Sequence, residues 1–431
     1  PDSNLGPPEE EICRGTSITL SALFQQGQAP PPGATYLWSR GETTPTITTD
    51  SAGCYSVTIT DPATGCSRSA RVNVRVYKPD PNQPPPPREE ARWYFGSGSG
   101  IRFVGGQPQP ITGNANTPEG TSSISDASGN FLFYTDGRNI FDKAGNPMLD
   151  RDGNPVTLAS GNGINGGPNS TQAVLIVSQP GCNDCEPVYY VFTTTDIGAG
   201  GSQLQYSVVD MRLNNGLGQV TQQNVPLFDT STERLAAIRA QPDSTNPQRP
   251  ETTWIVTHDF NSNTFRVYPL TGRGVGSPRT YSIGETHGPA TQNGEGYLKV
   301  YEDKVVVAKP GAPGEENVVQ VFPFNSATGE ISGPPNTIRL GTAPPSAYGV
   351  EIAGDSTLYV SLSGNGTDSS RIVGFNLASG VDSTIAKSRR QIVATTDVLG
   401  ALQLDPNGQR LFVARQNQNA LGEITSPGTL A

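Results

Sequence analysis

The chain has 431 residues, of which only 34% are hydrophobic, and it is rich in glycine (50) and proline (38). Its formal net charge is −10, 16% of its residues are charged, and no cluster of Lys and Arg stands out, which argues against nucleic acid or an anionic membrane surface as a partner. No apolar run approaches the roughly 20 residues that a spanning helix needs, so we expect no membrane span. We expect instead many turns, short strands and a surface of neutral polar residues.

The N-terminal part is predicted to hold one small domain. Residues 1–10 are polar and are interpreted as a tail or linker. Residues 11–77 contain segments that alternate apolar and polar positions and are separated by Gly, Pro and Asp turns, a pattern typical of a small β-sandwich. Trp38, with Tyr55 on a late strand, suits an immunoglobulin-like core. The expected strands are 16–20, 35–38, 54–60 and 70–76.

A proline-rich segment, 78–90, is predicted to be a semi-rigid linker between this domain and the rest of the chain. Residues 91–431 repeat a unit of strand, tight Asp/Asn/Gly turn and second strand, as in the segment 402–413. Such units at roughly 50–65-residue spacing indicate a β-propeller, because each small sheet can bury its faces only by stacking on its neighbours. Six units are expected, at 121–142, 172–210, 235–269, 297–324, 349–377 and 400–424.

A seventh unit is expected from the strands around Trp93 and Ile101, which makes the predicted fold all-β with a seven-bladed propeller. We also expect a chain trimmed or processed before Pro1, and a propeller that continues beyond the last residue.

Several polar side chains could carry chemistry, but each also has a structural interpretation. Glu119, Asp126, Asp136 and Glu351 lie near strand ends and could form a pair of glycosidase carboxylates, although hydrogen bonding to loop backbone is favoured. His258 and His287, the only histidines, lack a recognisable nucleophile motif and are interpreted as structural or surface residues.

No cofactor is expected from the sequence. The segments beginning at Asp142 and Asp150 faintly resemble calcium loops, but Gly153 comes too early for an EF-hand and tight turns are favoured. The five cysteines are Cys13, Cys54, Cys66, Cys182 and Cys185. They favour disulfides over free thiols, and a zinc site at Cys182 and Cys185 is disfavoured because there is no second cysteine pair.

The order of several strings resembles the propeller region of large secreted surface proteins of Bacteroidota. These strings are Trp93-Tyr-Phe-Gly-Ser-Gly-Ser-Gly-Ile-Arg-Phe103, Glu119-Gly-Thr-Ser-Ser-Ile-Ser-Asp126, Gly129-Asn-Phe-Leu-Phe-Tyr-Thr-Asp-Gly137, Pro187-Val-Tyr-Tyr-Val-Phe-Thr193, Tyr348-Gly-Val-Glu351 and Gly400-Ala-Leu-Gln-Leu-Asp-Pro-Asn-Gly408. The first domain similarly resembles the immunoglobulin-like repeats of such proteins, in Gly53-Cys-Tyr-Ser-Val-Thr-Ile-Thr-Asp61 and Gly65-Cys66. Such proteins often end in a gliding-motility-associated sorting domain of the type IX secretion system, which this sequence does not contain.

The resemblance implies export across the outer membrane, a secreted or cell-surface location, and the secretion machinery as a partner. It also implies a disulfide between Cys13 and Cys66, which leaves Cys54 as the odd thiol. Cys182 and Cys185 are then expected to bridge within a hairpin loop. Asp-Ser motifs resembling the short O-glycosylation signal of Bacteroidota point to Ser51, Ser244, Ser356 and Ser383, although Asp-Ser is also ordinary turn chemistry.

Two main hypotheses of function follow from the sequence. The first is a non-catalytic surface or extracellular protein that acts in adhesion, gliding motility or a surface assembly, with cell-surface glycans or further copies of itself as partners. The alternative is a propeller that binds or processes carbohydrate. Carboxylates and aromatic residues that converge at one mouth of the propeller would favour the alternative.

Overall fold

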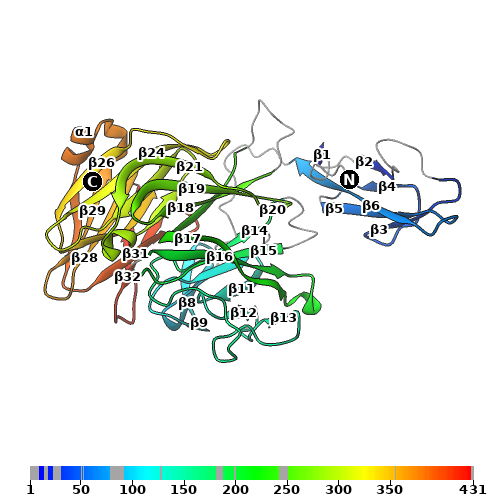
Figure 1. The fold of residues 1–431 in the computed structure, drawn as a ribbon, viewed down its shortest axis with the longest axis horizontal. Helices are drawn as coiled ribbons and strands as arrows, with labels where there is room; N and C mark the ends of the chain where they lie inside the picture. Colours follow the sequence, from blue (N-terminus) through cyan, green and yellow to red (C-terminus); the bar gives the residue numbers. More distant parts are fainter. Residues whose placement is uncertain are drawn as a thin grey trace.

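The computed structural model describes residues 9–13, 18–22, 31–49, 51, 53–77, 92–126, 129–180, 188–198, 200–241, 251–354 and 356–428, with backbone alone at 9–13, 75–77 and 291. Figure 1 shows strands β1–β6 at one end of the molecule and the remaining strands gathered at the other. The predicted linker 78–90 lies outside the described residues.

The N-terminal unit has two sheets that share one core. One sheet has the strand order β1-β6-β5-β3 and the other pairs β2 with β4. Trp38 and Tyr55 are both buried in the shared core, as expected. The strands are β1 (Glu9–Cys13), β2 (Ile18–Ser21), β3 (Thr35–Trp38), β4 (Thr46–Thr49), β5 (Gly53–Thr60) and β6 (Ser67–Tyr77).

The predicted pairing of Cys13 with Cys66 is wrong. Cys13 lies opposite Tyr77 at the end of β6, whereas Cys66 immediately precedes the start of the same strand. About ten extended residues at roughly 3.3 Å each separate the two positions, far beyond the Cα distance of about 7 Å that a disulfide tolerates. Cys66 is a free, exposed thiol. Cys54, predicted to be the odd thiol, is instead disulfide-bonded.

Residues 92–428 form seven successive sheets, named sheet 1 to sheet 7 in chain order. Sheet 1 contains β7 (Arg92–Phe95), β8 (Ser97–Val104) and β9 (Gln107–Asn116); sheet 2 contains β10 (Ser122–Ser125), β11 (Phe131–Thr135) and β12 (Ile140–Asp142). Sheet 3 contains β14 (Val174–Ser178), β15 (Val188–Thr194), β16 (Ser202–Asp210) and the first half of β17 (Gln219–Arg239); sheet 4 contains the second half of β17, β18 (Thr253–Asp259), β19 (Ser262–Thr271) and β21 (Arg279–His287).

The last three sheets are built in the same way, from antiparallel neighbours in chain order. Sheet 5 contains β22 (Leu298–Val300), β23 (Lys304–Lys309), β24 (Glu316–Asn325) and β26 (Asn336–Thr342); sheet 6 contains β27 (Ser346–Ala353), β28 (Thr357–Ser363), β29 (Ser370–Asn376) and β30 (Arg390–Thr395); sheet 7 contains β31 (Leu399–Leu404), β32 (Arg410–Arg415) and β33 (Gly422–Thr425). Short strands β13 (Leu149–Asp150), β20 (Gly274–Val275) and β25 (Glu330–Ile331) pair at their edges.

Each hydrophobic cluster of this region joins two consecutive sheets. Sheets 2 and 3 share one core, sheets 3 and 4 a second and sheets 5 and 6 a third, where Val319 of β24 packs with Val350 of β27 and Val360 of β28. Further clusters join sheets 4 and 5, sheets 6 and 7, and sheets 1 and 2. The alternating apolar residues therefore bury both faces of most sheets, as radial stacking requires.

The first sheet also meets the last, which closes the ring. The ring of Trp93 in β7 lies 5.6 Å from that of Phe412 in β32, and Phe103 in β8 lies 6.1 Å from the same ring. Arg410 of sheet 7 donates to Gln107 of sheet 1 at 2.7 Å. Seven sheets stacked in a closed circle are a β-propeller, and the predicted all-β propeller is confirmed.

Strand β17 belongs to two sheets at once. Its residues from Gln219 pair with β16, its residues to Arg239 pair with β18, and the ladder shifts register between Ser231 and Leu235. Sheets 3 and 4 are therefore one continuous nine-stranded ladder.

Helix contributes little to the described chain, whose longest helix, α1 (Asp382–Lys387), has six residues. A helix of this length is far too short to cross a bilayer, and no other described helix could do so. The hairpins predicted from Asp and Gly turns are formed: β31 and β32 are joined by a turn in which Gly408, at φ 66°, donates to the carbonyl of Asp405 at 2.9 Å.

Candidate functional site

The starts of the inner strands gather around the axis of the propeller, at a face that we call the mouth. Consecutive inner strands β10, β14, β17, β22, β27 and β31 contact one another in this order. The side chains at the centre of the mouth come from the first residues of these strands, from the residues just before them and, in β17, from the point where the strand passes from sheet 3 to sheet 4. These are Glu119, Thr171, Glu233, Glu295 and Tyr348.

Two of the carboxylates at the mouth are bound across sheets. Glu233 of β17 accepts hydrogen bonds from the backbone N–H of Thr171 at 2.8 Å, from its hydroxyl at 2.9 Å, and from the N–H of Ile197 at 2.8 Å. Glu119 accepts one from the phenol of Tyr348 at 2.7 Å, which links sheet 2 to sheet 6. These bonds tie together strands that are far apart in the sequence.

Burial raises the pKa values of the three carboxyl groups at the mouth. Burial raises the pKa of Glu119 to about 7, and the nearby charges of Glu233, Glu295 and Asp196 add to the increase. Burial also raises the pKa of Glu233 and of Glu295. Near neutral pH, Glu119 is therefore a mixture of the acid and the carboxylate.

We expect Glu119→Gln to stabilise the propeller at alkaline pH. Because the folded pKa lies above the ordinary value of 4.5, the folded state holds a proton that the unfolded state has lost between pH 4.5 and about 7. In the wild type, the contribution of the Glu119 carboxyl group to the free energy of unfolding is complete below pH 4.5 and is lost as the pH rises through 7. Gln can still accept the Tyr348 hydrogen bond and never ionises.

At about pH 8, Glu119→Gln should raise the free energy of unfolding by an amount on the order of 1–3 kcal/mol, and at about pH 5 the variant and the wild type should differ little. Chemical denaturation of both proteins at the two pH values measures it. Glu330→Gln, at an exposed residue of β25, is the matched control. Equal differences at both pH values would contradict the assignment of this proton to Glu119.

Two long polar side chains below the mouth join three sheets. Gln172 exchanges hydrogen bonds with the backbone of Leu235 in sheet 4 and of Leu298 in sheet 5, through both its amide nitrogen and its oxygen. Arg234, which is fully buried, donates to the carbonyls of Ala308, Asn293 and Glu295. These bonds link sheets 3, 4 and 5 through their backbone.

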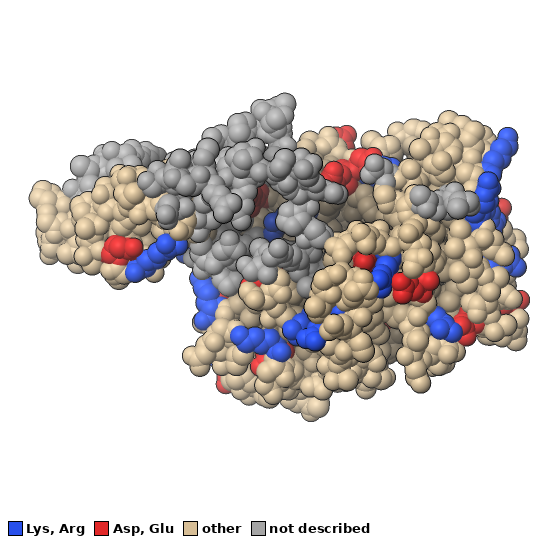
Figure 2. All heavy atoms as spheres, turned by 180° about the vertical axis from the view of Figure 1, so that it is seen from behind, with Lys and Arg blue, Asp and Glu red and all other residues tan. Residues whose placement is uncertain are grey.

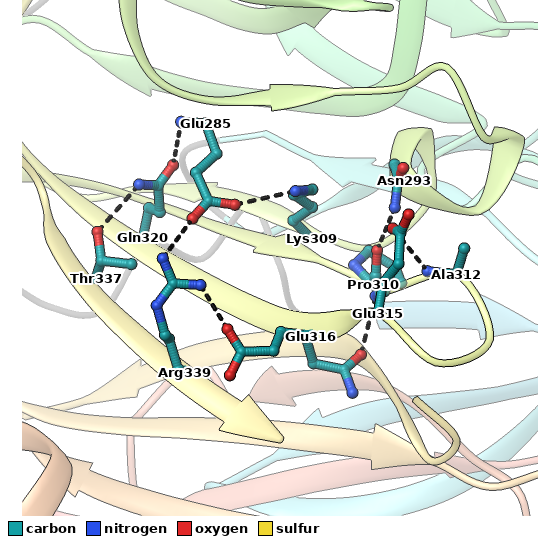
Figure 3. Close-up of polar contacts among 12 residues, drawn as sticks. Glu285, Asn293, Lys309, Pro310, Ala312, Glu315, Glu316, Gln320, Thr337 and Arg339 are labelled. Carbon is teal, nitrogen blue, oxygen red and sulfur yellow. Dashed lines mark hydrogen bonds and ion pairs between the residues drawn. The ribbon is translucent and has the colours of Figure 1, made fainter. Parts of the chain in front are cut away.

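A shallow hollow of about 510 Å³ lies between sheets 4 and 5 beside the mouth, and Figure 3 shows the side chains around it. Glu285 of β21 accepts from Lys309 at 3.0 Å and from Arg339 at 3.2 Å, and Arg339 also binds Glu316 at 2.7 Å. Gln320 accepts from the N–H of Glu285 at 2.9 Å. Both cations of the hollow are therefore neutralised by carboxylates from neighbouring strands.

The other carboxylates considered in the sequence do not join Glu119. Asp136 accepts hydrogen bonds from the backbone of Asn116, Arg138 and Asn139, and Asp126 from the backbone and side chain of Asn130. This is the favoured interpretation, in which carboxylates bind loop backbone.

Glu351 is occupied between sheets 5 and 6. It binds Lys299 at 2.8 Å and the phenol of Tyr301 at 2.6 Å. It is therefore part of an inter-sheet contact and not one member of a carboxylate pair with Glu119.

His258 and His287 form a buried pair under the hollow. Their rings stack with centroids 3.8 Å apart, and both are almost completely buried. Burial, helped by the charge of Arg234, lowers the pKa of His258 to about 3, and the pKa of His287 also lies well below its usual value. Both are therefore neutral at physiological pH, in keeping with the structural interpretation of the sequence.

The Asp142 and Asp150 segments form tight turns. Asp142 accepts from the N–H of Ala144 at 2.8 Å and of Asn146 at 2.9 Å, and Asp150 accepts from Asp152 and Asn154 in the same way. Among the described residues, no group of three or more His, Cys, Asp or Glu side chains is arranged to hold a metal ion.

Of the proposed glycosylation residues, Ser51 and Ser383 are exposed and Ser356 is half-buried. Ser244 lies outside the described residues, as do Cys182 and Cys185. Figure 2 shows a face on which most of the described surface is neither acidic nor basic, with Lys, Arg, Asp and Glu in small scattered groups. That face agrees with the low share of charged residues in the sequence, 16%.

No protein-family model and no curated protein matches the chain. Among solved structures, the chain is similar to a quinoprotein alcohol dehydrogenase-like protein from Bacteroides thetaiotaomicron, at 10% identity and a TM-score of 0.37, over 99% of this chain and 93% of that one. It is also similar to a putative 6-phosphogluconolactonase from Bacteroides uniformis, at 13% identity and a TM-score of 0.42, over 76% of this chain and 87% of that one.

A third similar structure is the WD40 domain of SCAP from fission yeast, at 11% identity and a TM-score of 0.34, over 76% of this chain and 81% of that one. At these identities and TM-scores the similarities say nothing about activity. The propeller assignment rests on the seven stacked sheets.

Sequence reasoning found Glu119 but missed its partners. Glu233, Glu295 and Tyr348 lie 114 to 229 positions away, as the numbers show, and no local motif connects them. The one available signal was position: Glu295 and Tyr348, like Glu119, lie close to the start of an inner strand, whereas Glu233 lies inside the long strand β17.

Proposed function

We propose that this protein is a non-catalytic extracellular surface protein that acts through binding, in adhesion or in a surface assembly. The observation that carries this proposal is the use of polar groups at the mouth. Glu233 accepts three hydrogen bonds, Glu119 is bound by Tyr348, and the cations of the adjacent hollow are paired. Groups tied in this way hold the sheets together and are poorly placed to exchange protons with a substrate.

Composition and resemblance support the location. The neutral polar surface and the strings shared with secreted Bacteroidota surface proteins favour export, with the type IX secretion machinery as a transient partner. The N-terminal unit would then be an immunoglobulin-like spacer, which the proline-rich segment 78–90 joins to the propeller in the sequence.

The proposal is tested with the purified full chain. We expect it to bind cells, glycans or further copies of itself, and to turn over no member of a panel of oligosaccharides and peptides. Binding is measured with labelled protein on cells and on a glycan array, and self-association by sedimentation. Turnover that survives extensive purification would overturn the proposal.

A second candidate, a carbohydrate-processing propeller, is favoured by one observation. Glu119 has a pKa raised to about 7 and lies near other carboxylates, which is the pattern of a glycosidase general acid. Turnover of a glycan that disappears in Glu119→Gln while the fold is retained would support this candidate.

A further inference from the structure

A second hollow, of about 620 Å³, lies between sheets 1 and 2, away from the groups described above; we call it the basic slot. Its volume falls within the range of roughly 300–1,000 Å³ that is typical of small-molecule sites. Within the described part of the chain, three cations line it and no carboxylate does. The lining residues are Arg92, Tyr94, Arg102, Ile111, Thr112, Gly113, Asn114, Tyr134, Lys143, Ala144 and Gly145.

Two of the cations are forced together by strand register. Arg92 of β7 is directly opposite Arg102 of β8, so both side chains lie on the same face of sheet 1. Like charges in this position destabilise a sheet unless something neutralises them. Arg102 donates to the neutral side chain of Gln109 at 3.1 Å, and Arg92 lies 4.9 Å from the ring centre of Phe131. Among the described residues, neither forms an ion pair.

The third cation comes from the neighbouring sheet. Lys143 is exposed on the turn after β12 and faces the slot from sheet 2. The carboxylate of Asp142, next to it, is buried and accepts two backbone hydrogen bonds of its own turn, from Ala144 and Asn146. Burial, together with the charges of Asp142 and Asp136, raises the pKa of Tyr134 in the floor of the slot. These carboxylates therefore offset part of the positive charge, but among the described residues neither forms an ion pair with a cation that lines the slot.

The floor of the slot is closed by two buried tyrosine side chains. The ring of Tyr94 is stacked on that of Tyr134, with centroids 4.1 Å apart. The backbone of Gly113 approaches Tyr94 so closely that an added Cβ would lie 2.4 Å from its ring. Thr112 and Asn114 add exposed polar groups at the rim. Cations beside aromatic rings and small polar groups suit a ligand with an acidic group and a hydroxyl-rich body.

We propose that the basic slot binds an acidic saccharide, whose carboxylate or sulfate is held by Arg92, Arg102 and Lys143 and whose hydroxyl groups bind Thr112 and Asn114 at the rim. The slot is too confined, and the chain too negative, for a long nucleic acid. The inference does not depend on the proposed function, because the slot is separate from the mouth and would bind such a ligand in an adhesin or in an enzyme alike.

The test uses the full chain and a galacturonic acid trisaccharide, with the methyl ester of the same trisaccharide as a neutral probe. The variant is Arg102→Gln with Lys143→Gln, both exposed positions. The control is Lys387→Gln with Arg389→Gln, which removes the same charge at exposed positions on and beside α1. We expect the wild type and the control to bind the acidic probe alike, and the slot variant to bind at least about tenfold more weakly by calorimetry.

The binding should also weaken with added salt, because the contacts are charged. Sulfate alone and a short single-stranded oligonucleotide complete the experiment. If the slot variant binds the acidic trisaccharide as the wild type does, or if the wild type does not bind it, the proposal fails. If sulfate or the oligonucleotide binds the slot more tightly than the trisaccharide does, the saccharide part of the proposal is overturned.

Discussion

Replacing Arg234 with alanine should destabilise the propeller by about 3–5 kcal/mol. The side chain is fully buried on a strand of sheet 4 and supplies hydrogen bonds to three carbonyls, that of Ala308 in sheet 5 and those of Asn293 and Glu295 in the segment that precedes sheet 5. Without it, these carbonyls lose their donor in a place that water does not reach, and a large cavity remains. Chemical denaturation followed by tryptophan fluorescence measures the loss.

The control for Arg234 is Arg151→Ala, at an exposed arginine on the turn after β13, where a change of less than about 0.5 kcal/mol is expected. Arg234→Lys tests the role of the hydrogen bonds. Lysine keeps the charge but offers a single nitrogen, so this variant should fall between the wild type and the alanine variant. An alanine variant as stable as the wild type would show that the three carbonyls do not need the guanidinium.

The second large effect is a loss of stability in acid that comes from the stacked histidines. The unfolded histidines bind protons below their ordinary pKa of 6.5, whereas folded His258 does so only near 3 and His287 well below its ordinary value. The contribution of the neutral histidines to the free energy of unfolding is complete above pH 6.5 and is lost as the pH falls toward 3. In this pH range, each histidine should lower the free energy of unfolding by about 1.4 kcal/mol for each unit by which the pH falls.

His287→Phe isolates this effect, because phenylalanine can keep the stacked ring but cannot take a proton. Between about pH 6 and about pH 4.5, the free energy of unfolding should fall less steeply with decreasing pH in the variant than in the wild type. The difference between the two slopes should correspond to close to one proton taken up on unfolding. Glu119 acts in the opposite direction between pH 4.5 and 7, so the histidine effect should be steeper in the Glu119→Gln background. Parallel curves for wild type and His287→Phe would exclude His287 as a source of the acid sensitivity.

Local patterns were enough to predict most of the propeller. Hairpins such as the one that joins β31 and β32 are encoded by neighbouring residues: an Asp and a Gly in the turn, and alternating apolar residues on either side. The seventh sheet could be predicted because Trp93 and Ile101 stand in short strands of the same kind. Buried Trp38 and Tyr55 were likewise visible, since their strands alternate cleanly.

Contacts between sheets could not be predicted in this way. Arg234 and Gln172 look like ordinary polar residues near a strand, and only the stacking of neighbouring sheets brings the carbonyls of Asn293 and Leu298 within their reach. The basic slot could not be predicted for the same reason. Lys143 is 41 positions from Arg102 in the sequence, and Arg102 lies opposite Arg92 only because of the register in which β7 pairs with β8. The cysteine pairing failed because it was transferred by resemblance, without the register of β1 on β6.

The double membership of β17 also determines where this ring can open. A circle of seven separate blades has seven junctions, but here the third and fourth blades are crossed by one unbroken backbone ladder. Parting them would break main-chain hydrogen bonds, whereas the first and last blades are held, among the described residues, by side chains such as Trp93 and Phe412. Under mechanical load the circle should therefore unlatch between its two chain ends, while the third and fourth blades stay together as a single double-width segment.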